Sequence, residues 1–333
     1  MTMHRVMVLD AVHPLLPQRL EASGLCEVLD YSAASREEIL NALMASDVPV
    51  HGLVVRSRMN LDATVLSQAV NLHWIARAGS GYDGIDTHYT ASNNIVLFHA
   101  SEGNRLAVAE HVIAMMLAWS NHLRQGHAQI QQGIWDRESN RGRQLSGTTV
   151  GLIGYGHNGS QTARLLAALG CKVLVYDKFL QGYTPAGQEF IVESTMEDLF
   201  DQAQMLTLHT PLTELTRNLV QWDFLKRFLR LRLLVNAARG AMVHLPDLLR
   251  AIDHNLLEGA CLDTLPVEDP REWDPETMKR ILTHPRILLS PHVAGWTVES
   301  YEAISEVLAY KILAHLQSEE VGDGRQCPKS LSA

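Results

Sequence analysis

The sequence has few cysteines, a deficit of positive charge and no long hydrophobic run, and each shortage excludes a class of protein. Its four cysteines lie far apart, at positions 26, 171, 261 and 327, and form no CxxC pair. This spacing argues against a disulfide scaffold and against a structural zinc site. We therefore expect reduced thiols and no bound metal.

Positive charge is outweighed by negative charge along the chain. Lys and Arg total 28 against 37 Asp and Glu, which gives a formal net charge of -9. A broad basic surface that would attract nucleic-acid phosphates or anionic lipid is therefore not expected. We predict neither a nucleic-acid partner nor a membrane partner.

Hydrophobic runs are short. The longest clear one, Val112 to Trp119, is well below the ~20 residues that cross a bilayer. The segment from Met1 to Asp10 lacks the apolar stretch of a signal peptide. These absences predict a cytoplasmic protein.

Length and composition suit a globular protein of two domains. The chain has 333 residues, of which 46% are hydrophobic and 20% charged. At about 150 residues per domain, two domains are expected. Coiled coils and disordered chains have a different composition.

Strand-like and helix-like segments alternate along the chain, which is typical of parallel sheets with crossover helices. The first series has strands expected at 5–9, 52–55 and 72–76 and helices at 15–22 and 63–69. A second series has strands expected at 148–153, 172–176, 205–209, 233–236, 259–263 and 287–289. Six strands are the number expected of a complete dinucleotide-binding sheet. A helix is also expected at 107–122, entered through 101–104, and another at 298–316, before a polar tail.

A glycine-rich loop joins the first strand of the second series to its helix. The loop reads Gly154-Tyr155-Gly156-His157-Asn158-Gly159 and has the GxGxxG pattern in its strand-turn-helix context. Glycines there permit a tight turn, close approach of a pyrophosphate and close packing of helix on strand. Glycines also form ordinary turns, so the loop alone is a weak signal.

An acidic residue strengthens the interpretation. Asp177 ends the next strand, 18 residues after Gly159, near the offset of about 20 expected for a ribose-binding carboxylate. A 2′-phosphate at that position would be repelled by the carboxylate, so we predict NAD as the cofactor in preference to NADP. Lys178 beside it weakens the repulsion.

Several ordered segments give the chain a resemblance to the D-isomer specific 2-hydroxyacid dehydrogenase family, and within it to the D-3-phosphoglycerate dehydrogenases. Besides the glycine loop they are RAGSGYDGID (77–86), EGNRLAVAEH (102–111), PLTELTR (211–217), NAARG (236–240), GACLD (259–263) and SPHVAG (290–295). Only one helix and a short polar tail follow residue 300, so the likeness is to a short form without an added regulatory domain.

The resemblance implies an α/β protein of two doubly wound parallel-sheet domains. A Rossmann-type NAD-binding domain at residues 102–295 would be inserted into a flavodoxin-like substrate-binding domain at 1–101 and 296–333. Two copies would form a homodimer through the NAD-binding domain.

The resemblance also implies three catalytic residues. His292 would donate or accept the substrate proton, because imidazole titrates near neutral pH. Glu268 would bind the imidazole and favour its protonated form, and Arg239 would hold the substrate carboxylate with its planar fork. Here the sequence departs from the family pattern, because Asp269 stands between Glu268 and the proline that usually follows it. Asp269 is therefore an alternative partner for His292.

Further site residues follow from the same resemblance. Asp263 would orient the nicotinamide carboxamide. The remaining cofactor contacts would come from the glycine loop and from Asp177, His209, Thr210, Pro211 and Ala237. Substrate contacts would come from Arg56, Ser57, Arg58, Ser80 and Gly81, with the two arginines placed to hold a phosphate.

The function expected is NAD-dependent hydride transfer with a D-2-hydroxy acid. The reaction predicted first is the oxidation of 3-phospho-D-glycerate to 3-phosphohydroxypyruvate. One alternative is a reductase of unphosphorylated 2-keto acids such as hydroxypyruvate or glyoxylate. The other is a non-catalytic NAD-sensing protein that resembles the family's corepressors.

Overall fold

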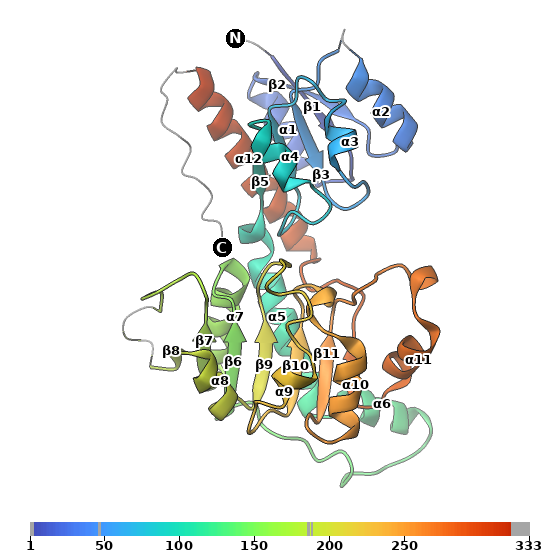
Figure 1. The fold of residues 1–333 in the computed structure, drawn as a ribbon, viewed down its shortest axis with the longest axis vertical. Coiled ribbons are helices and arrows are strands. Elements are labelled where there is room, and N and C mark those ends of the chain that lie inside the picture. The colour runs from blue at the N-terminus through green and yellow to red at the C-terminus, as the bar shows by residue number, and fades with distance from the viewer. Residues whose placement is uncertain (1–2, 46–47, 185–186, 188, 321–333) are drawn as a thin grey trace. The chain divides into compact units, whose positions relative to one another are not determined.

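The computed structural model describes residues 3–45, 48–184, 187 and 189–320. The chain divides into two compact units (Figure 1). The first contains the residues up to Asn104 and those from Thr297 onward, and the second is Arg105–Trp296. Of the segments discussed above, Cys327 and the polar tail from residue 321 lie outside the described residues.

The first unit is built on a five-stranded parallel sheet in the order β2-β1-β3-β4-β5. Its strands are β1 (His4–Val8), β2 (Cys26–Asp30), β3 (Gly52–Val55), β4 (Trp74–Arg77) and β5 (Val96–His99). Strand β3 is buried throughout, as expected of a parallel strand covered on both faces.

Helices cover both faces of this sheet. They are α1 (Leu15–Ala22), α2 (Arg36–Met44), α3 (Ala63–Leu66), α4 (Thr87–Ser92) and α12 (Val298–Glu320). One apolar core contains Leu16 of α1 with Leu308 and Ile312 of α12, and a separate core on the other face contains Ile39 of α2. Side chains of successive strand residues alternate between the two cores, as the period of a strand requires.

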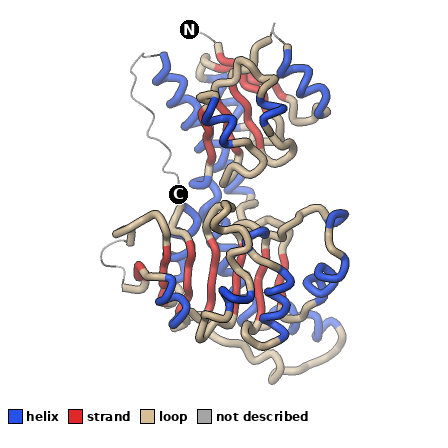
Figure 2. The backbone as a smooth tube through the Cα atoms, viewed as in Figure 1, coloured by secondary structure: helices blue, strands red, loops and turns tan. Residues whose placement is uncertain are grey.

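The second unit is built on a seven-stranded parallel sheet in the order β12-β11-β10-β9-β6-β7-β8 (Figure 2). Its strands are β6 (Thr149–Ile153), β7 (Lys172–Tyr176), β8 (Ile191–Glu193), β9 (Met205–Leu208), β10 (Leu233–Asn236), β11 (Gly259–Leu262) and β12 (Ile287–Leu289). The chain winds outward from β6 to β8 and then returns to the other side of β6. The order reverses between β6 and β9, which is where doubly wound sheets bind their ligands.

Helices also cover both faces of the second sheet, over two apolar cores. They are α5 (Ser101–Ser120), which crosses the boundary between the units, α6 (Leu123–Gln131), α7 (His157–Ala168), α8 (Met196–Gln202), α9 (Trp222–Leu225), α10 (Leu245–Asp253) and α11 (Pro275–Thr283). Two short 3-10 turns, η1 (Gly240–Met242) and η2 (Pro270–Glu272), follow β10 and β11 along the chain.

The prediction of two parallel-sheet α/β units is confirmed. The sequence patterns missed three strands: β2, β5 and β8. Exposed or half-buried positions interrupt the apolar pattern of all three. The long helix begins at Ser101, so 101–104 is its first turn, whereas the prediction made it the entry to the helix.

Among the described residues, no helix combines the length and the apolar character needed to cross a membrane. Cys26, Cys171 and Cys261 are buried free thiols.

Candidate active site

The candidate residues of the second unit lie at one edge of its sheet. Because all strands of that sheet are parallel, their carboxyl ends meet at the same edge, which the arrowheads in Figure 1 mark. Each candidate follows one of these ends: the glycine loop after β6, Asp177 after β7, His209–Pro211 after β9, Ala237 and Arg239 after β10, Asp263 after β11 and His292 after β12.

The glycine loop has the geometry that its pattern predicts. Gly154 has φ +94°, and a Cβ there would lie 2.7 Å from the carbonyl oxygen of His209. A Cβ on Gly159 would lie 2.0 Å from the carbonyl oxygen of Gly154, so α7 can begin against the loop only with glycine at 159. Gly156 faces open space. The loop therefore leaves room beside the N-terminus of a twelve-residue helix, where backbone amides can bind an anion.

Asp177 is tied to the loop by its own carboxylate. Its Oδ2 accepts a hydrogen bond from the backbone N–H of Tyr155 at 2.8 Å, and its Oδ1 accepts from the backbone N–H groups of Phe179 and Leu180. The Tyr155 ring is buried and packs on Tyr183, with centroids 4.9 Å apart. Asp177 therefore holds the loop in shape in addition to presenting a negative charge beside it.

His209 lies directly across from the loop. Its backbone N–H donates to the carbonyl of Ile153 at 2.8 Å, and its Nε2 is 3.0 Å from Oγ1 of Thr207. Burial lowers the pKa of His209 to about 3. This imidazole is therefore neutral at physiological pH and adds no positive charge to the edge.

Glu268 and His292 form a close polar pair at the edge. Glu268 Oε1 lies 2.5 Å from His292 Nδ1, although the two residues are 24 positions apart. The Asp269 carboxylate instead binds Arg271 and caps η2. The alternative partner from the sequence is thus turned to a different residue, and Glu268 contacts the imidazole.

His292 lies in a turn whose backbone is hydrogen-bonded to Asp263. Its φ is +52°, a left-handed conformation that non-glycine residues seldom adopt, and its backbone N–H donates to the Asp263 carbonyl at 2.7 Å. The Asp263 carboxylate is 1% exposed and accepts hydrogen bonds from Ser290 Oγ at 2.5 Å and from the N–H groups of Val293 and Ala294 at 3.0 Å. Asp263, which the sequence predicts to orient the nicotinamide, thus also holds this turn.

Burial alone would raise the pKa of Asp263. The hydrogen bonds that its carboxylate receives outweigh burial and lower the pKa to about 2. A buried negative charge is therefore maintained directly behind the turn that carries His292.

Arg239 is held by the loop after β10. The Asn236 side chain accepts from the Ala238 N–H at 3.1 Å and donates to the Arg239 carbonyl at 2.9 Å. Gly240 follows, and a Cβ there would lie 1.9 Å from the backbone of Leu265. The segment that carries Arg239 and the segment that leads to Glu268 are therefore in contact through their backbones.

The candidate substrate residues belong to the first unit. Backbone N–H groups of Arg56 and Arg58 donate to the buried Asp10 carboxylate, at 2.5 and 3.2 Å, and Ser57 lies exposed between them. Ser80 Oγ donates to Asn104 Oδ1 at 2.8 Å, and Gly81 has φ +86°.

The Arg58 side chain is turned toward its own unit. Its guanidinium donates to the carbonyls of Leu9, Tyr31, Ser32 and Ala34. These contacts fix the segment between β2 and α2 and occupy both terminal nitrogens of the fork.

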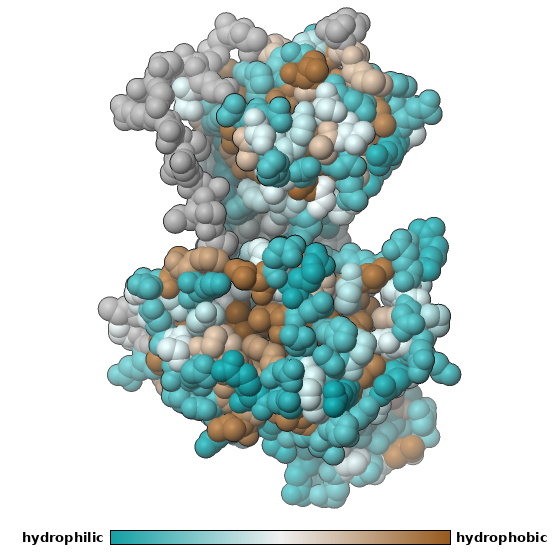
Figure 3. Space-filling model, in the orientation of Figure 1, coloured by the Kyte–Doolittle hydropathy of each residue, from teal (hydrophilic) through white to brown (hydrophobic). Residues whose placement is uncertain are grey.

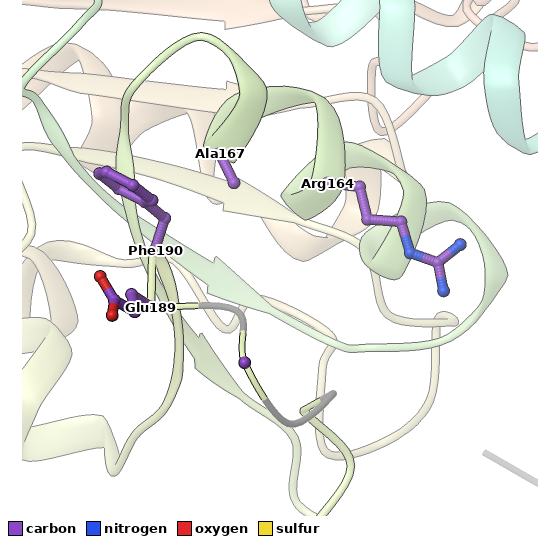
Figure 4. Close-up of a pocket in the computed structure, with 5 residues that line it drawn as sticks. Arg164, Ala167, Glu189 and Phe190 are labelled. Carbon is purple, nitrogen blue, oxygen red and sulfur yellow. The ribbon is translucent and has the colours of Figure 1, made fainter.

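Two surface cavities, each of about 270 Å³, lie away from this edge. One is lined by Arg164, Ala167, Gly187, Glu189 and Phe190, with Arg164 pointing away from Phe190 (Figure 4). Ala167 is ten residues into α7, about 15 Å along the helix from the glycine loop. The other lies where β11 and β12 begin, at the opposite edge. Across the described ranges, no group of three or more His, Cys, Asp or Glu side chains could hold a metal ion.

Sequence reasoning missed three residues that hold the site. Asn236 shapes the Arg239 loop, and Ser290 and His111 bind Asp263. All three lie inside segments already singled out, and the positions of Asn236 and Ser290 at strand ends were an available signal. His111 ends the segment 102–111 but is 179 residues from Ser290, and no local pattern connects the two.

Comparison with known proteins finds relatives among the 2-hydroxyacid dehydrogenases. The profile described as "D-isomer specific 2-hydroxyacid dehydrogenase, NAD binding domain" matches residues 113–294. D-3-phosphoglycerate dehydrogenase of Methanocaldococcus jannaschii is 29% identical over 317 residues, which are 95% of this chain but 58% of that protein. The chain therefore spans little more than half the length of this relative.

Two further relatives match over nearly their whole length. Hydroxypyruvate reductase of Thermotoga maritima is 28% identical, and the alignment covers 95% of this chain and 99% of that protein. The crystal structure of the TT0316 protein from Thermus thermophilus superposes with a TM-score of 0.77 at 28% identity, covering 94% of this chain and 97% of that chain.

Proposed function

The chain belongs to the D-isomer specific 2-hydroxyacid dehydrogenase family, and we propose that it transfers a hydride between NAD and a D-2-hydroxy acid or its 2-keto acid. The observation that carries the proposal is the 2.5 Å contact between Glu268 and His292 at the sheet edge that also bears the glycine loop. An imidazole bound by a carboxylate is suited to proton transfer near neutral pH.

The residues at the switch point suit NAD. Gly156 leaves open space before the amides of α7, and Asn158 Oδ1 is a buried acceptor without a partner among the described residues. Asp177 adds a carboxylate that can accept from ribose hydroxyls and would repel a 2′-phosphate. His209, Thr210, Pro211 and Ala237 would complete the contacts. When bound, NAD supplies the hydride acceptor for the alcohol, and NADH the hydride donor for the ketone.

His292 and Glu268 would act together on the substrate oxygen. In the reducing direction the imidazolium gives its proton to the oxygen that receives negative charge, and in the oxidising direction the neutral ring takes the proton from the alcohol. Nδ1 faces Glu268, so Nε2 is the nitrogen left to meet the substrate. Glu268 holds the ring orientation and favours the charged ring.

Arg239 would bind the substrate carboxylate. A guanidinium can hold a carboxylate by two parallel hydrogen bonds, which fixes the plane of the acid. Asn236 and Gly240 keep the chain on both sides of Arg239 in place. We assign backbone amides around Ser80 and Gly81, together with Ser57 and Arg56, to further substrate contacts.

We propose an unphosphorylated 2-keto acid such as hydroxypyruvate or glyoxylate as the substrate, with 3-phosphohydroxypyruvate as the competing candidate. The Arg58 guanidinium donates to backbone carbonyls of its own unit, which counts against it as a phosphate contact and supports this choice.

We further propose that two copies associate through the NAD-binding domain. Helix α6 has no buried residue, and its Leu123 and Ile130 are 59% and 53% exposed, followed by Ile134 at 45% and Trp135 at 80%. Figure 3 shows hydrophobic residues interspersed with hydrophilic ones on the face that it draws. Several large apolar side chains exposed along one stretch of chain suit an interface, and a second copy is the simplest occupant. Ile130→Asp should yield a monomer in sedimentation, and an unchanged mass would place any interface elsewhere.

The substrate is tested by NADH oxidation with 3-phosphohydroxypyruvate, hydroxypyruvate, glyoxylate and pyruvate offered separately. We expect the highest kcat/KM with an unphosphorylated acid. Arg58→Gln should change all four values by a similar factor, because it loosens a segment of the fold. A loss confined to the phosphorylated substrate would restore Arg58 as a phosphate contact. Absence of turnover with every acid, together with retained NADH binding, would favour the NAD-sensing alternative.

A further inference from the structure

A chain of hydrogen bonds leads from helix α5 to the turn of His292. His111 Nε2 lies 2.9 Å from Ser290 Oγ, and Ser290 Oγ lies 2.5 Å from Asp263 Oδ1. His111 Nε2 is also 3.4 Å from the same carboxylate oxygen. None of these three residues has a part in the proton transfer described above.

The direction of the chain follows from its chemistry. The Asp263 carboxylate is ionised, because its pKa is about 2, and an ionised carboxylate only accepts hydrogen bonds. The single hydroxyl proton of Ser290 must therefore point to Asp263. Ser290 Oγ then has only lone pairs for His111, so the imidazole must carry its proton on Nε2 and donate it.

The far end of the chain is the turn that presents His292. Asp263 binds the N–H groups of Val293 and Ala294 through its carboxylate and that of His292 through its carbonyl. His292 has φ +52°, a left-handed conformation that few non-glycine residues adopt. Ser290 and His111 fix the rotation of the carboxylate that makes these bonds.

We propose that His111 and Ser290 are positioning residues for His292, which hold the catalytic turn by a directed hydrogen-bond chain from α5 to Asp263. This inference rests on the proposed function, since it assumes that His292 transfers the substrate proton. Neither residue contacts the substrate. They act by holding Asp263 in place, and Asp263 in turn keeps the His292 ring in contact with Glu268.

The kinetic test uses paired variants that remove or keep each hydrogen bond. Ser290→Ala and His111→Leu should lower kcat for keto-acid reduction by about tenfold to a hundredfold, the cost of misplacing a reacting group by about 1 Å. KM for the acid and the Kd of NADH should change by less than about threefold, because binding groups are untouched. Ser290→Thr keeps the hydroxyl and His111→Gln keeps an Nε2 donor, so both should recover most of the rate.

A purely structural role predicts a different pattern. It would lower Tm and the bound fraction of NADH together, without recovery of kcat by Thr or Gln. Such a result, or an unchanged kcat in Ser290→Ala and His111→Leu when the wild type is active, overturns the inference and leaves the proposed function intact.

A spectroscopic test does not depend on turnover. With 15N-labelled histidine, the wild-type protein should show His111 with a proton on Nε2, assigned by its disappearance in His111→Gln. Ser290→Ala should shift that signal. A His111 ring protonated only at Nδ1 would overturn the inference even if activity were normal, whereas inactivity of the wild type on all acids would count against the proposed function alone.

Discussion

Removal of the Glu268 charge tests the proposed proton transfer quantitatively. At a charge separation of about 4 Å, a carboxylate and an imidazolium attract by about 1 kcal/mol in water and by about 4 kcal/mol at the effective dielectric of a protein surface. The His292 and Glu268 side chains are 44% and 61% exposed, so solvent screening places the pair near the lower value. About 1 kcal/mol corresponds to about a fivefold change in rate.

The sign follows from the charge of the reacting ring. Glu268→Gln removes the negative charge that attracts the imidazolium, which is the form that gives its proton in keto-acid reduction. The kcat/KM of the variant for keto-acid reduction should therefore fall by about fivefold.

The assay is kcat/KM for keto-acid reduction. Asp269→Asn is the matched control, because Asp269 is the adjacent carboxylate and binds Arg271. It should leave kcat/KM unchanged. A kcat/KM that falls in Asp269→Asn and is unchanged in Glu268→Gln would refute the assignment of Glu268.

Three further outcomes are expected. Gly156→Ala should weaken NADH binding with little change in Tm, because its Cβ meets nothing in the protein. Gly159→Ala should lower Tm, because its Cβ would lie 2.0 Å from a carbonyl oxygen. A larger decrease in Tm for Gly156→Ala than for Gly159→Ala, measured by calorimetry, would contradict the loop geometry. His209→Gln should leave the pH profile of kcat/KM unmoved, since the pKa of His209 is already about 3; a displaced profile would mean that this imidazole titrates near neutral pH. The pKa of Asp263 is lowered to about 2, so its contribution of about 2 kcal/mol is present above about pH 4 and is lost as pH falls toward 2; denaturant unfolding at about pH 5 and about pH 3 should show a smaller decrease for Asp263→Asn than for the wild type.

The sequence predicted the parts of the molecule whose signals are local. The glycine loop, Asp177 and the strand before His292 each lie in a short segment, and the residues around each segment predict its structure. Strands β2, β5 and β8 were not predicted, because their exposed or half-buried positions interrupt the apolar pattern. Short edge strands of this kind are defined by their neighbours in the sheet.

Within the site, the choice between Glu268 and Asp269 depended on side-chain direction. Adjacent residues in a loop point different ways, and only the fold decides that Asp269 turns to Arg271. The contacts of Arg58 with carbonyls up to 49 residues away and the link from His111 to Ser290 are likewise tertiary. The hydrogen bonds that the Asp263 carboxylate accepts are tertiary too, because the amides that donate them belong to a distant turn.

The central claim is that His292 transfers the substrate proton in an NAD-dependent hydride transfer. Its most direct test is the kcat of His292→Ala with NADH and the best keto acid, measured beside NADH binding by the same variant. A loss of about 10²-fold or more in kcat with NADH affinity retained is the expected result, since positioned acid-base catalysis contributes that much. An unchanged kcat would contradict the claim and move the proton transfer to another group.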